Sequence, residues 1–296
     1  MTSWVFPMPG NERFGAQVGA AVGARLGVIE YRRFPDGESY VRLPAVESDS
    51  AMLVCTLDRP DEKILPLLFA ARTMKELGVR RVGLIAPYLA YMRQDRRFRS
   101  GEALTSSCFA DLISGAFDWI VTVDPHLHRR ASLSEIYRIP DRVVHAAPLL
   151  AAWIREQIAE PLVVGPDAES EQWASEVAAA AGCPHVVLRK TRHGDRDVVI
   201  DFPDVSGWKG RTAVLIDDIV SSGRTMVMAA RGLRDLGFSA ICALGVHGIF
   251  AASAYEDLLS AGVARVATTN CVPHSSNAID VSQAVADAAA DLQSKT

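Results

Sequence analysis

Apolar residues recur along the chain in two alternating patterns, one with the period of a helix and one with the character of a buried strand. Residues 61–77 carry apolar side chains three or four positions apart, namely Ile64, Leu67, Leu68, Ala71, Met74 and Leu77. This spacing predicts an amphipathic helix, in which Pro66 is tolerated because it lies close to the start. Continuous apolar runs at 51–55 and 81–86 flank the helix and predict buried strands, an order typical of a parallel α/β sheet.

The same alternation continues to the end of the chain. We expect further helices at 14–26, 105–115, 149–158, around Trp173 and Val177, and at 225–236, 254–259 and 280–292. Strands are expected at 120–123, 162–164, 186–188, 198–200, 213–218, 240–246 and 263–268. The pattern predicts two similar α/β domains, residues 1–146 and 147–296, with mainly parallel sheets flanked by helices. We also expect the last helix to pack on the N-terminal domain. No sequence repeat is detectable, so duplication is a hypothesis here.

Residues 28–43 interrupt the alternation with a predicted β-hairpin. Two strand-like runs flank Pro35-Asp36-Gly37, in which proline sets one backbone dihedral and glycine accepts a positive one. Ordinary turn chemistry accounts for Phe34, Asp36 and Glu38 when this segment is taken alone.

Composition narrows the class of protein. The 296 residues are 49% hydrophobic with a net charge of −4, which predicts a globular chain and argues against a general nucleic-acid coat. The absence of a long apolar run and of a signal-peptide pattern at the N-terminus predicts no membrane partner and a cytoplasmic location. The five cysteines are widely scattered, which favours buried reduced thiols over a zinc or redox site.

Residues 213–225, AVLIDDIVSSGRT, carry the clearest chemistry. An apolar strand ends in Asp217 and Asp218, and a short loop of small residues leads into a helix near Thr225. The first amide groups of a helix have no partner within it and readily bind phosphate. Ser221, Ser222 and Thr225 add hydroxyl donors, and the carboxylates suit sugar hydroxyls or, through water, magnesium. The alternative is a surface turn whose Asp and Ser residues only cap the helix.

Other polar clusters follow predicted strands, where parallel α/β sheets place their ligands. Residues 87–99 contain four arginines and two tyrosines, a composition that suits a nucleotide triphosphate or, alternatively, a solvated basic loop paired with acids such as Asp95. Asp124 and His126 end another strand and can hold a divalent ion, although Asp124 as a turn cap is the alternative. Asp167 also ends a strand. Residues 189–196 are expected to form a mobile loop in which Lys190 and Arg192 close over a phosphate chain, or else a solvated hairpin tip.

Taken together, several motifs in order resemble the ribose-phosphate pyrophosphokinase family. They are FPDGE at 34–38, APYLAYMRQDRRF at 86–98, VTVDPH at 121–126, GPDA at 165–168, Lys190-x-Arg192, VLIDDIVSSGRT at 214–225, VHGIF at 246–250 and TTNCVP at 268–273. The resemblance covers residues 34–273 and implies two type I phosphoribosyltransferase-like domains with the active site between them. It also implies transfer of the diphosphoryl group of ATP to the 1-hydroxyl of ribose 5-phosphate, with Mg²⁺ as the cofactor.

The resemblance further implies roles for individual residues. Lys190, Arg192 and His126 would be catalytic, and Asp124, His126 and Asp167 would hold the metal. ATP would contact Phe34, Asp36, Glu38, Arg93, Gln94 and Asp95, with the first three reaching the adenine of a neighbouring subunit in a homo-oligomer, a dimer or larger. Ribose 5-phosphate would contact Asp217, Asp218, Ser221, Ser222, Gly223, Arg224 and Thr225.

Three departures from the family pattern bear on these expectations. Arg224 stands where many members have a second glycine, the segment 167–170 lacks the glycine that often follows its acid, and DPHLHRR differs from the usual run after the strand. Glu169 and Ser170 are expected to crowd or reshape the pocket. The alternatives are a non-catalytic regulatory subunit of the same fold and a phosphoribosyltransferase that consumes phosphoribosyl pyrophosphate. The number of subunits, the preferred donor and sugar, and regulation by phosphate or ADP do not follow from the sequence.

Overall fold

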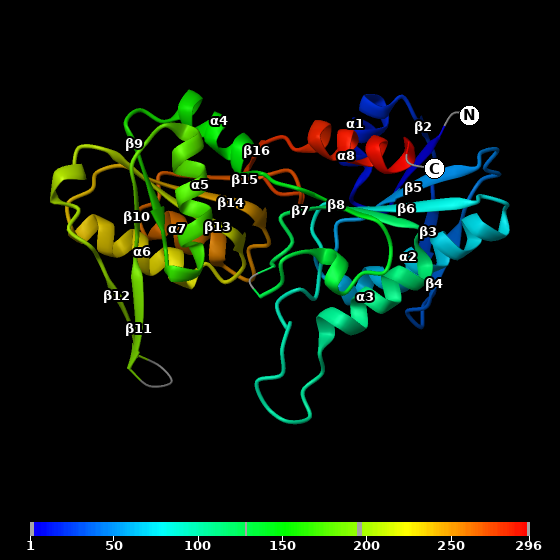
Figure 1. Cartoon of the computed structure of the whole chain (residues 1–296), viewed down its shortest axis with the longest axis horizontal. Helices are drawn as coiled ribbons and strands as arrows, with labels where there is room; N and C mark the ends of the chain where they lie inside the picture. The colour runs from blue at the N-terminus through cyan, green and yellow to red at the C-terminus, as the bar shows by residue number, and fades with distance from the viewer. Residues whose placement is uncertain (1–2, 128, 194–196, 295–296) are drawn as a thin grey trace. The chain divides into compact units, whose positions relative to one another are not determined.

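The computed structural model of the chain describes residues 3–127, 129–193 and 197–294, and for residues 169, 190–193 and 197–200 it describes the backbone alone. The chain divides into two compact units (Figure 1). Unit 1 comprises residues 1–144, 271–273 and 281–296, and unit 2 comprises residues 145–270 and 274–280.

Unit 1 is built on a six-stranded sheet in the order β2-β1-β5-β6-β7-β8, and every pair of neighbouring strands is parallel. The strands are β1 (Trp4–Pro7), β2 (Arg25–Leu26), β5 (Ser50–Val54), β6 (Arg81–Ala86), β7 (Trp119–Val123) and β8 (Asp141–Val144). The four central strands are almost wholly buried apolar runs, because helices cover both faces of a parallel sheet.

Unit 2 repeats this arrangement with the strand order β10-β9-β13-β14-β15-β16, again parallel throughout. Its strands are β9 (Pro161–Gly165), β10 (His185–Val187), β13 (Thr212–Val220), β14 (Ile241–Gly248), β15 (Arg265–Thr269) and β16 (Asn277–Ile279). In unit 1, β1 lies between β2 and β5, and in unit 2, β9 lies between β10 and β13. In both units a hairpin separates the second of these three strands from the third along the chain. The two strand orders therefore support the duplication hypothesis.

The helices follow the same plan in both units. In unit 1, α1 (Glu12–Val22) contacts α8 (Ser282–Ser294), and α2 (Pro60–Glu76) contacts α3 (Thr105–Ala116). In unit 2, α5 (Glu171–Ala181) contacts α4 (Ala147–Gln157), and α6 (Arg224–Asp235) contacts α7 (Ala254–Ser260). Figure 1 shows each pair on its own face of the sheet of its unit.

The last helix of each repeat is exchanged. Helix α4 follows β8 of unit 1 but packs in unit 2 on α5 and β16, and α8 follows β16 of unit 2 but packs in unit 1 on α1, β7 and β8. An ion pair between Arg142 of β8 and Asp291 of α8, 2.6 Å long, adds to the contact in unit 1. Each unit thus completes its fold with a helix that belongs by chain order to the other repeat.

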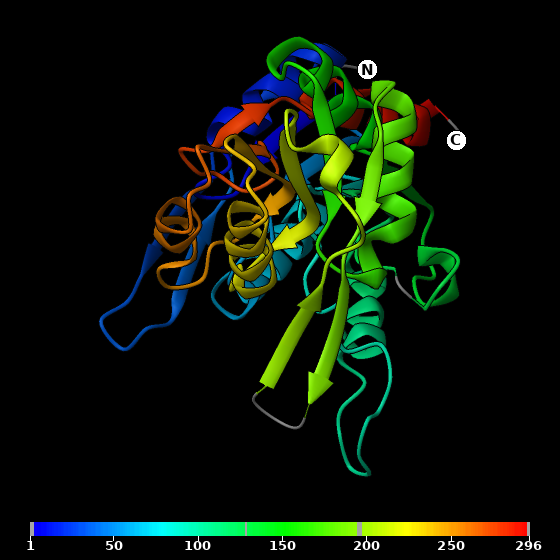
Figure 2. The same ribbon diagram turned by 90° about the vertical axis from the view of Figure 1, so that its left-hand side faces the viewer.

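Each unit also carries an antiparallel hairpin at the same point of the chain order. In unit 1 it consists of β3 (Glu30–Arg33) and β4 (Ser39–Arg42), and in unit 2 of β11 (Arg189–His193) and β12 (Asp197–Asp201). Figure 2 shows β11 and β12 extending away from the sheet of unit 2. The predicted hairpin at 28–43 is confirmed, with the Phe34 amide donating to the Glu38 carbonyl and Gly37 at a φ of +94°.

Several predicted elements are corrected by the structure. The helix expected at 14–26 ends at Val22, because Gly23 adopts the left-handed conformation and Arg25–Leu26 forms edge strand β2. The loop expected at 189–196 is wrong over its first part, where residues 189–193 pair with 197–201, and residues 194–196 lie outside the described residues. Strands β1, β8 and β16 had no counterpart among the predicted elements.

A buried hydrophobic cluster lies within each unit. It includes Phe6, Leu53, Leu84 and Ile120 in unit 1, and Val164, Leu215, Leu233 and Leu258 in unit 2. Within the described residues, no helix combines the length and apolar character that crossing a membrane requires.

Candidate active site

Carboxyl groups gather at the carboxyl ends of two neighbouring strands of unit 2. Asp217 and Asp218 lie near the end of β13, and Asp167 follows β9, its parallel neighbour. The Asp218 amide donates to Asp217 Oδ1 at 3.0 Å, and the Ile219 amide donates to Asp218 Oδ1 at 2.8 Å. Burial raises the pKa of Asp217 well above its usual range, and the charges of Asp218 and Asp167 raise it further. The site therefore favours a cation or hydroxyl donors, which stabilise the ionised carboxylates.

Ser170 closes the turn that carries Asp167. Its hydroxyl donates to the Asp167 carbonyl at 2.6 Å, and its side chain is buried. A side chain at Gly165 would place its Cβ 2.7 Å from Ser170 Oγ, so the glycine leaves room for this packing. The Ser170 hydroxyl is therefore used within the turn, and the expectation that it crowds or reshapes the pocket stays a prediction. The side chain of Glu169 lies outside the described residues.

The loop at 221–223 leads from β13 into α6 as the sequence predicts. Gly223 takes a φ of +63° and precedes the first helical residue, Arg224, without any side chain capping the helix. Among the described residues, the hydroxyls of Ser221 and Ser222 have no recorded hydrogen-bond partner, and Ser221 is half-buried while Ser222 is exposed. Uncapped amides and free hydroxyls are groups that can bind an anion, as the sequence predicts for this loop.

A second loop of unit 2 braces the 221–223 loop. The amides of Ile249 and Phe250 donate to the Val220 carbonyl, and the Ala251 amide donates to the Ser221 carbonyl at 3.0 Å. Phe250 in turn packs on the imidazole of His274, with ring centroids 4.5 Å apart. These bonds fix the backbone where β13 runs into the 221–223 loop. The motif VHGIF marked this segment, but its bracing role was not predicted from the sequence.

In unit 1 the arginine-rich loop follows β6. Arg93 is exposed, and its guanidinium makes no recorded contact within the described part of the chain. Asp95, whose side chain is only 6% exposed, accepts a 2.8 Å bond from Arg129, and Gln94 accepts a 3.4 Å bond from Thr105. Asp95 thus pairs with Arg129 from outside the loop, and not with one of the loop arginines that the solvated-loop alternative pairs with it. Arg93 is left available for an anionic ligand.

Asp124 and His126 lie just beyond β7. Asp124 has a φ of +32°, a conformation that costs a non-glycine residue about 1–3 kcal/mol, and its amide donates to the Val144 carbonyl at 3.0 Å. His126 is half-buried. Within the described residues, no group of three His, Cys, Asp or Glu side chains forms a ready metal cage. The carboxylate of Asp124 is a ligand type that Mg²⁺ accepts, because this ion keeps several waters and binds through one or two carboxylates plus substrate phosphates.

The apex of the β3–β4 hairpin presents the remaining predicted nucleotide contacts. Phe34 is 38% exposed and meets Tyr40 edge to face, with ring centroids 6.3 Å apart. The Arg32 guanidinium lies 4.4 Å from the Phe34 centroid and 4.3 Å from that of Tyr40. The Asp36 carboxylate accepts a bond from the Glu38 amide at 3.2 Å. Phe34 is thus an exposed aromatic ring whose orientation Arg32 and Tyr40 fix.

The predicted residues fall into three groups within the units. Asp167, Asp217, Asp218 and the 221–225 loop gather at one sheet edge in unit 2, and Lys190 and Arg192 occupy alternate positions of strand β11. The nucleotide-side residues all lie in unit 1. Sequence reasoning missed Arg32, although alternation along the strand indicates that Arg32 and Phe34 share a face.

Comparisons with known proteins agree over nearly the whole chain. Residues 4–116 match the model of the N-terminal domain of ribose phosphate pyrophosphokinase, and residues 132–282 match that of the phosphoribosyl transferase domain. The ribose-phosphate pyrophosphokinases of Methanopyrus kandleri and Methanothermobacter thermautotrophicus are 34% and 35% identical in sequence to this chain. Each alignment covers 95% of this chain, with 96% and 98% of the respective relatives. The phosphoribosylpyrophosphate synthetase of Mycobacterium smegmatis has the same fold, with a TM-score of 0.87, 24% identity and full coverage of both chains.

Proposed function

The chain belongs to the ribose-phosphate pyrophosphokinase family, and from this membership we propose that it transfers the diphosphoryl group of ATP to the 1-hydroxyl of ribose 5-phosphate. The products are AMP and phosphoribosyl pyrophosphate. The observation that carries the proposal is the uncapped start of α6, with its free serine hydroxyls, directly beside the acid pair of β13. One end of this feature suits a phosphate and the other suits a sugar.

The sugar phosphate is assigned to the C-terminal domain, residues 147–296. Its 5-phosphate accepts bonds from the first amides of α6 and from the hydroxyls of Ser221, Ser222 and Thr225. Asp217 and Asp218 accept bonds from the ribose hydroxyls, which leaves the 1-hydroxyl oriented for reaction. Gly223 keeps the backbone free of a Cβ, and Arg224 begins the helix at this point.

The nucleotide is assigned to the N-terminal domain, residues 1–146. Arg93 binds the phosphate chain through its free guanidinium, and Gln94 and Asp95 hold the shape of the loop around it. The exposed apex with Phe34, Asp36 and Glu38 is assigned to the adenine of a neighbouring subunit, so the working enzyme is a homo-oligomer.

The transfer requires positioning and charge more than a strong base. The 1-hydroxyl oxygen forms a bond to the β-phosphorus of ATP, and the bond from that phosphorus to the oxygen bridging to the α-phosphate breaks. AMP leaves with that oxygen, and the hydroxyl proton passes to water. Lys190, Arg192 and His126 stabilise the negative charge on the transferring group.

The family transfers phosphoryl groups, a class of reaction that generally uses a divalent metal. We assign this role to Mg²⁺, held by Asp124, His126 and Asp167 together with water and substrate oxygens. When bound, the ion neutralises charge on the phosphate chain. A cytoplasmic location follows from the proposed substrates.

Product analysis tests the proposal. The purified chain is incubated with ATP, MgCl₂ and ribose 5-phosphate, and the phosphorus species are followed by ³¹P NMR. We expect AMP and phosphoribosyl pyrophosphate in equal amounts, with no formation of either when ribose 5-phosphate is omitted. Formation of ADP contradicts diphosphoryl transfer. No product, or consumption of added phosphoribosyl pyrophosphate with a purine base, supports the non-catalytic or the phosphoribosyltransferase alternative instead.

A further inference from the structure

The two sheets have the same topological switch point but different chemistry there. The chain runs outward from β1 to β2 and later returns to place β5 on the other side of β1, and unit 2 does the same at β9 and β13. Ligands of open α/β sheets bind outside the carboxyl ends of the strands at such a point. In unit 2 the acids Asp167 and Asp217 lie there. In unit 1 the corresponding strand ends lead into Met8 and Cys55.

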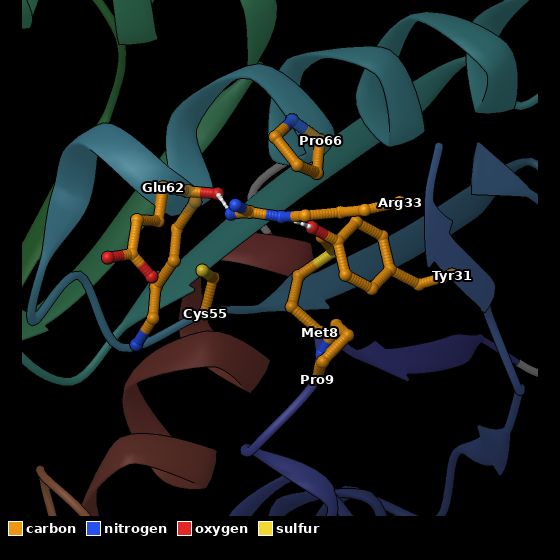
Figure 3. Close-up of a pocket in the computed structure, with 8 residues that line it drawn as sticks. Met8, Pro9, Tyr31, Arg33, Cys55, Glu62 and Pro66 are labelled. Atoms are coloured by element: carbon orange, nitrogen blue, oxygen red, sulfur yellow. Dashed lines mark hydrogen bonds between the residues drawn. The ribbon is translucent and has the colours of Figure 1, made fainter. Parts of the chain in front are cut away.

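A cavity of about 280 Å³ lies at this point of unit 1. Its lining residues come from the ends of β1 and β5, strand β3 of the hairpin and the first turns of α2, namely Met8, Pro9, Tyr31, Arg33, Cys55, Glu62, Lys63 and Pro66. In Figure 3 Arg33 extends from the hairpin towards the turn of α2 that carries Glu62 and Pro66, with Met8 and Cys55 on the opposite side. This volume lies near the lower end of the range for small-molecule sites.

Pro66 shapes the polar side of the cavity. A proline inside a helix has no amide hydrogen for the carbonyl four residues earlier, which here is that of Glu62. That carbonyl instead accepts a long 3.4 Å bond from Arg33 Nη2, while Arg33 Nε donates to the Tyr31 hydroxyl at 3.0 Å. A helix carbonyl thus faces the cavity with only one weak partner.

Of the charged groups on the cavity wall, the Lys63 ammonium has hydrogen-bond partners, whereas part of the Arg33 guanidinium and the Glu62 carboxylate have none recorded within the described residues. Lys63 bonds to Asp58 and to the Thr56 carbonyl. By contrast, Arg33 Nη1 and the Glu62 carboxylate have no recorded hydrogen-bond partner in the part of the chain that the structure describes. A ligand that satisfies both must offer acceptors to arginine and donors to a carboxylate.

A nucleobase meets these requirements, whereas an inorganic anion does not. A free phosphate would face the Glu62 carboxylate and leave the apolar walls of Met8, Pro9 and Pro66 uncovered. Guanine presents O6 and N7 as acceptors for an arginine and carries ring and amino N–H groups that a carboxylate can accept. Its flat face suits stacking on the Tyr31 ring. We propose that this cavity binds a purine base or nucleoside of the guanine type, separately from the nucleotide consumed in the reaction.

Hydrogen–deuterium exchange on the full chain tests the site with guanosine as the probe. We expect guanosine to slow exchange at residues 8–9, 30–33 and 60–66, while residues 87–99 of the proposed ATP loop stay unchanged. Inosine, which lacks the 2-amino group, should bind about 10- to 100-fold more weakly, because it loses a hydrogen bond to a charged group. The measurement needs no turnover, so its failure is independent of the proposed function.

Two substitutions on α2 make the test specific. Glu62→Gln should weaken guanosine binding about 10- to 100-fold, because the carboxylate becomes a neutral amide. Glu76→Gln changes the same charge on the same helix at an exposed ion pair with Arg72, and should leave binding unchanged. Absence of protection at these segments, protection confined to 87–99, equal protection by inorganic phosphate, or full binding by the Glu62→Gln chain would overturn the proposal.

Discussion

The two units share one strand order but carry different residues at the carboxyl ends of the equivalent strands. At the switch point of unit 2, β9 and β13 deliver Asp167 and Asp217, and the burial of Asp217 among other acids raises its pKa. At the switch point of unit 1, β1 and β5 lead to Met8 and Cys55, and burial raises the pKa of the Cys55 thiol to about 12. The thiol therefore stays un-ionised at neutral pH. Identical topology fixes where a ligand can bind, while the residues at the strand ends decide which ligand it is.

The difference extends to the loops that follow these strands. After β13, Ser221, Ser222 and Gly223 lead into an uncapped helix start. After β5, the Thr56 hydroxyl donates to the Cys271 carbonyl within unit 1, and Asp58 pairs with Lys63. The polar groups of the loop after β5 are thus bonded within unit 1, whereas the serine hydroxyls of the loop after β13 remain available to an anion.

The largest expected effect is on turnover and comes from replacing Lys190 of unit 2, a residue with no proposed counterpart in unit 1. Lys190→Ala should lower kcat about 100- to 1,000-fold, because one preorganised charge donor is lost from the transition state. Steady-state assays of AMP formation measure this. Lys209→Ala removes the same charge from an exposed position of unit 2 and should leave kcat unchanged. Equal effects of the two substitutions would show that Lys190 acts only through the net charge.

The exchange of terminal helices gives the next largest effect, on stability. Leu292 of α8 is buried in unit 1, and Leu292→Ala should lower the free energy of unfolding by about 2–5 kcal/mol through the cavity it leaves. Hydrogen exchange should accelerate in α1, β7 and β8. Ile154→Ala in α4 should instead accelerate exchange in α5 and β16 of unit 2. Gln283→Ala on the exposed side of α8 is the control, with a change within about 0.5 kcal/mol.

Much of the fold follows from periodicity, and the exceptions have physical causes. Helices α2 and α6 are long amphipathic segments, and the β3–β4 turn has proline and glycine at the required positions. Strand β16 is three residues long and β2 is two, too short for any period to be detected. Strand β11 is a run of charged and polar residues, so its sequence indicates a loop, whereas its pairing with β12 makes it a strand.

In the candidate site too, some features follow from the local sequence and others do not. Acids at strand ends and a hydroxyl-rich turn are local patterns, so Asp217 and the 221–225 loop could be identified from the sequence. The Asp95–Arg129 pair and the bonds from Ile249, Phe250 and Ala251 join segments distant in the chain, and no local pattern encodes them. The unit 1 cavity was likewise not predicted, because it depends on the packing of strand β3 of the hairpin against the helix turn at Pro66.

Weakening the phosphate loop should have an effect of intermediate size on sugar binding alone. Replacing Ser222 by alanine removes one hydroxyl that we assign to the 5-phosphate, and the KM for ribose 5-phosphate should rise about 10-fold or more. The KM for ATP should stay within twofold. Ser206→Ala, at an exposed position of unit 2, should change neither constant. An equal rise in both KM values after the Ser222 substitution would argue for a disturbed fold.

The smallest expected effect lies in the unit 1 hairpin. Arg32→Ala removes the guanidinium that lies over Phe34 and Tyr40, an exposed contact worth about 0.5–1 kcal/mol. The KM for ATP should rise about two- to fivefold without a change in the KM for ribose 5-phosphate. Arg42→Ala, which only breaks an exposed pair with Glu30, is the matched control on the partner strand. If the two variants had the same KM for ATP, a role of Arg32 in nucleotide binding would be contradicted.

Separate titration of the two substrates tests most directly whether the units divide them. Calorimetry would measure the binding of ribose 5-phosphate and of a non-hydrolysable ATP analogue to the wild type, Asp217→Asn and Arg93→Ala. We expect Asp217→Asn to weaken only the sugar phosphate and Arg93→Ala to weaken only the analogue, each about 10- to 100-fold, since each removes a charged hydrogen-bonding group. If either substitution weakened both ligands equally, or affected the ligand assigned to the other unit, the division of substrates between the units would be contradicted.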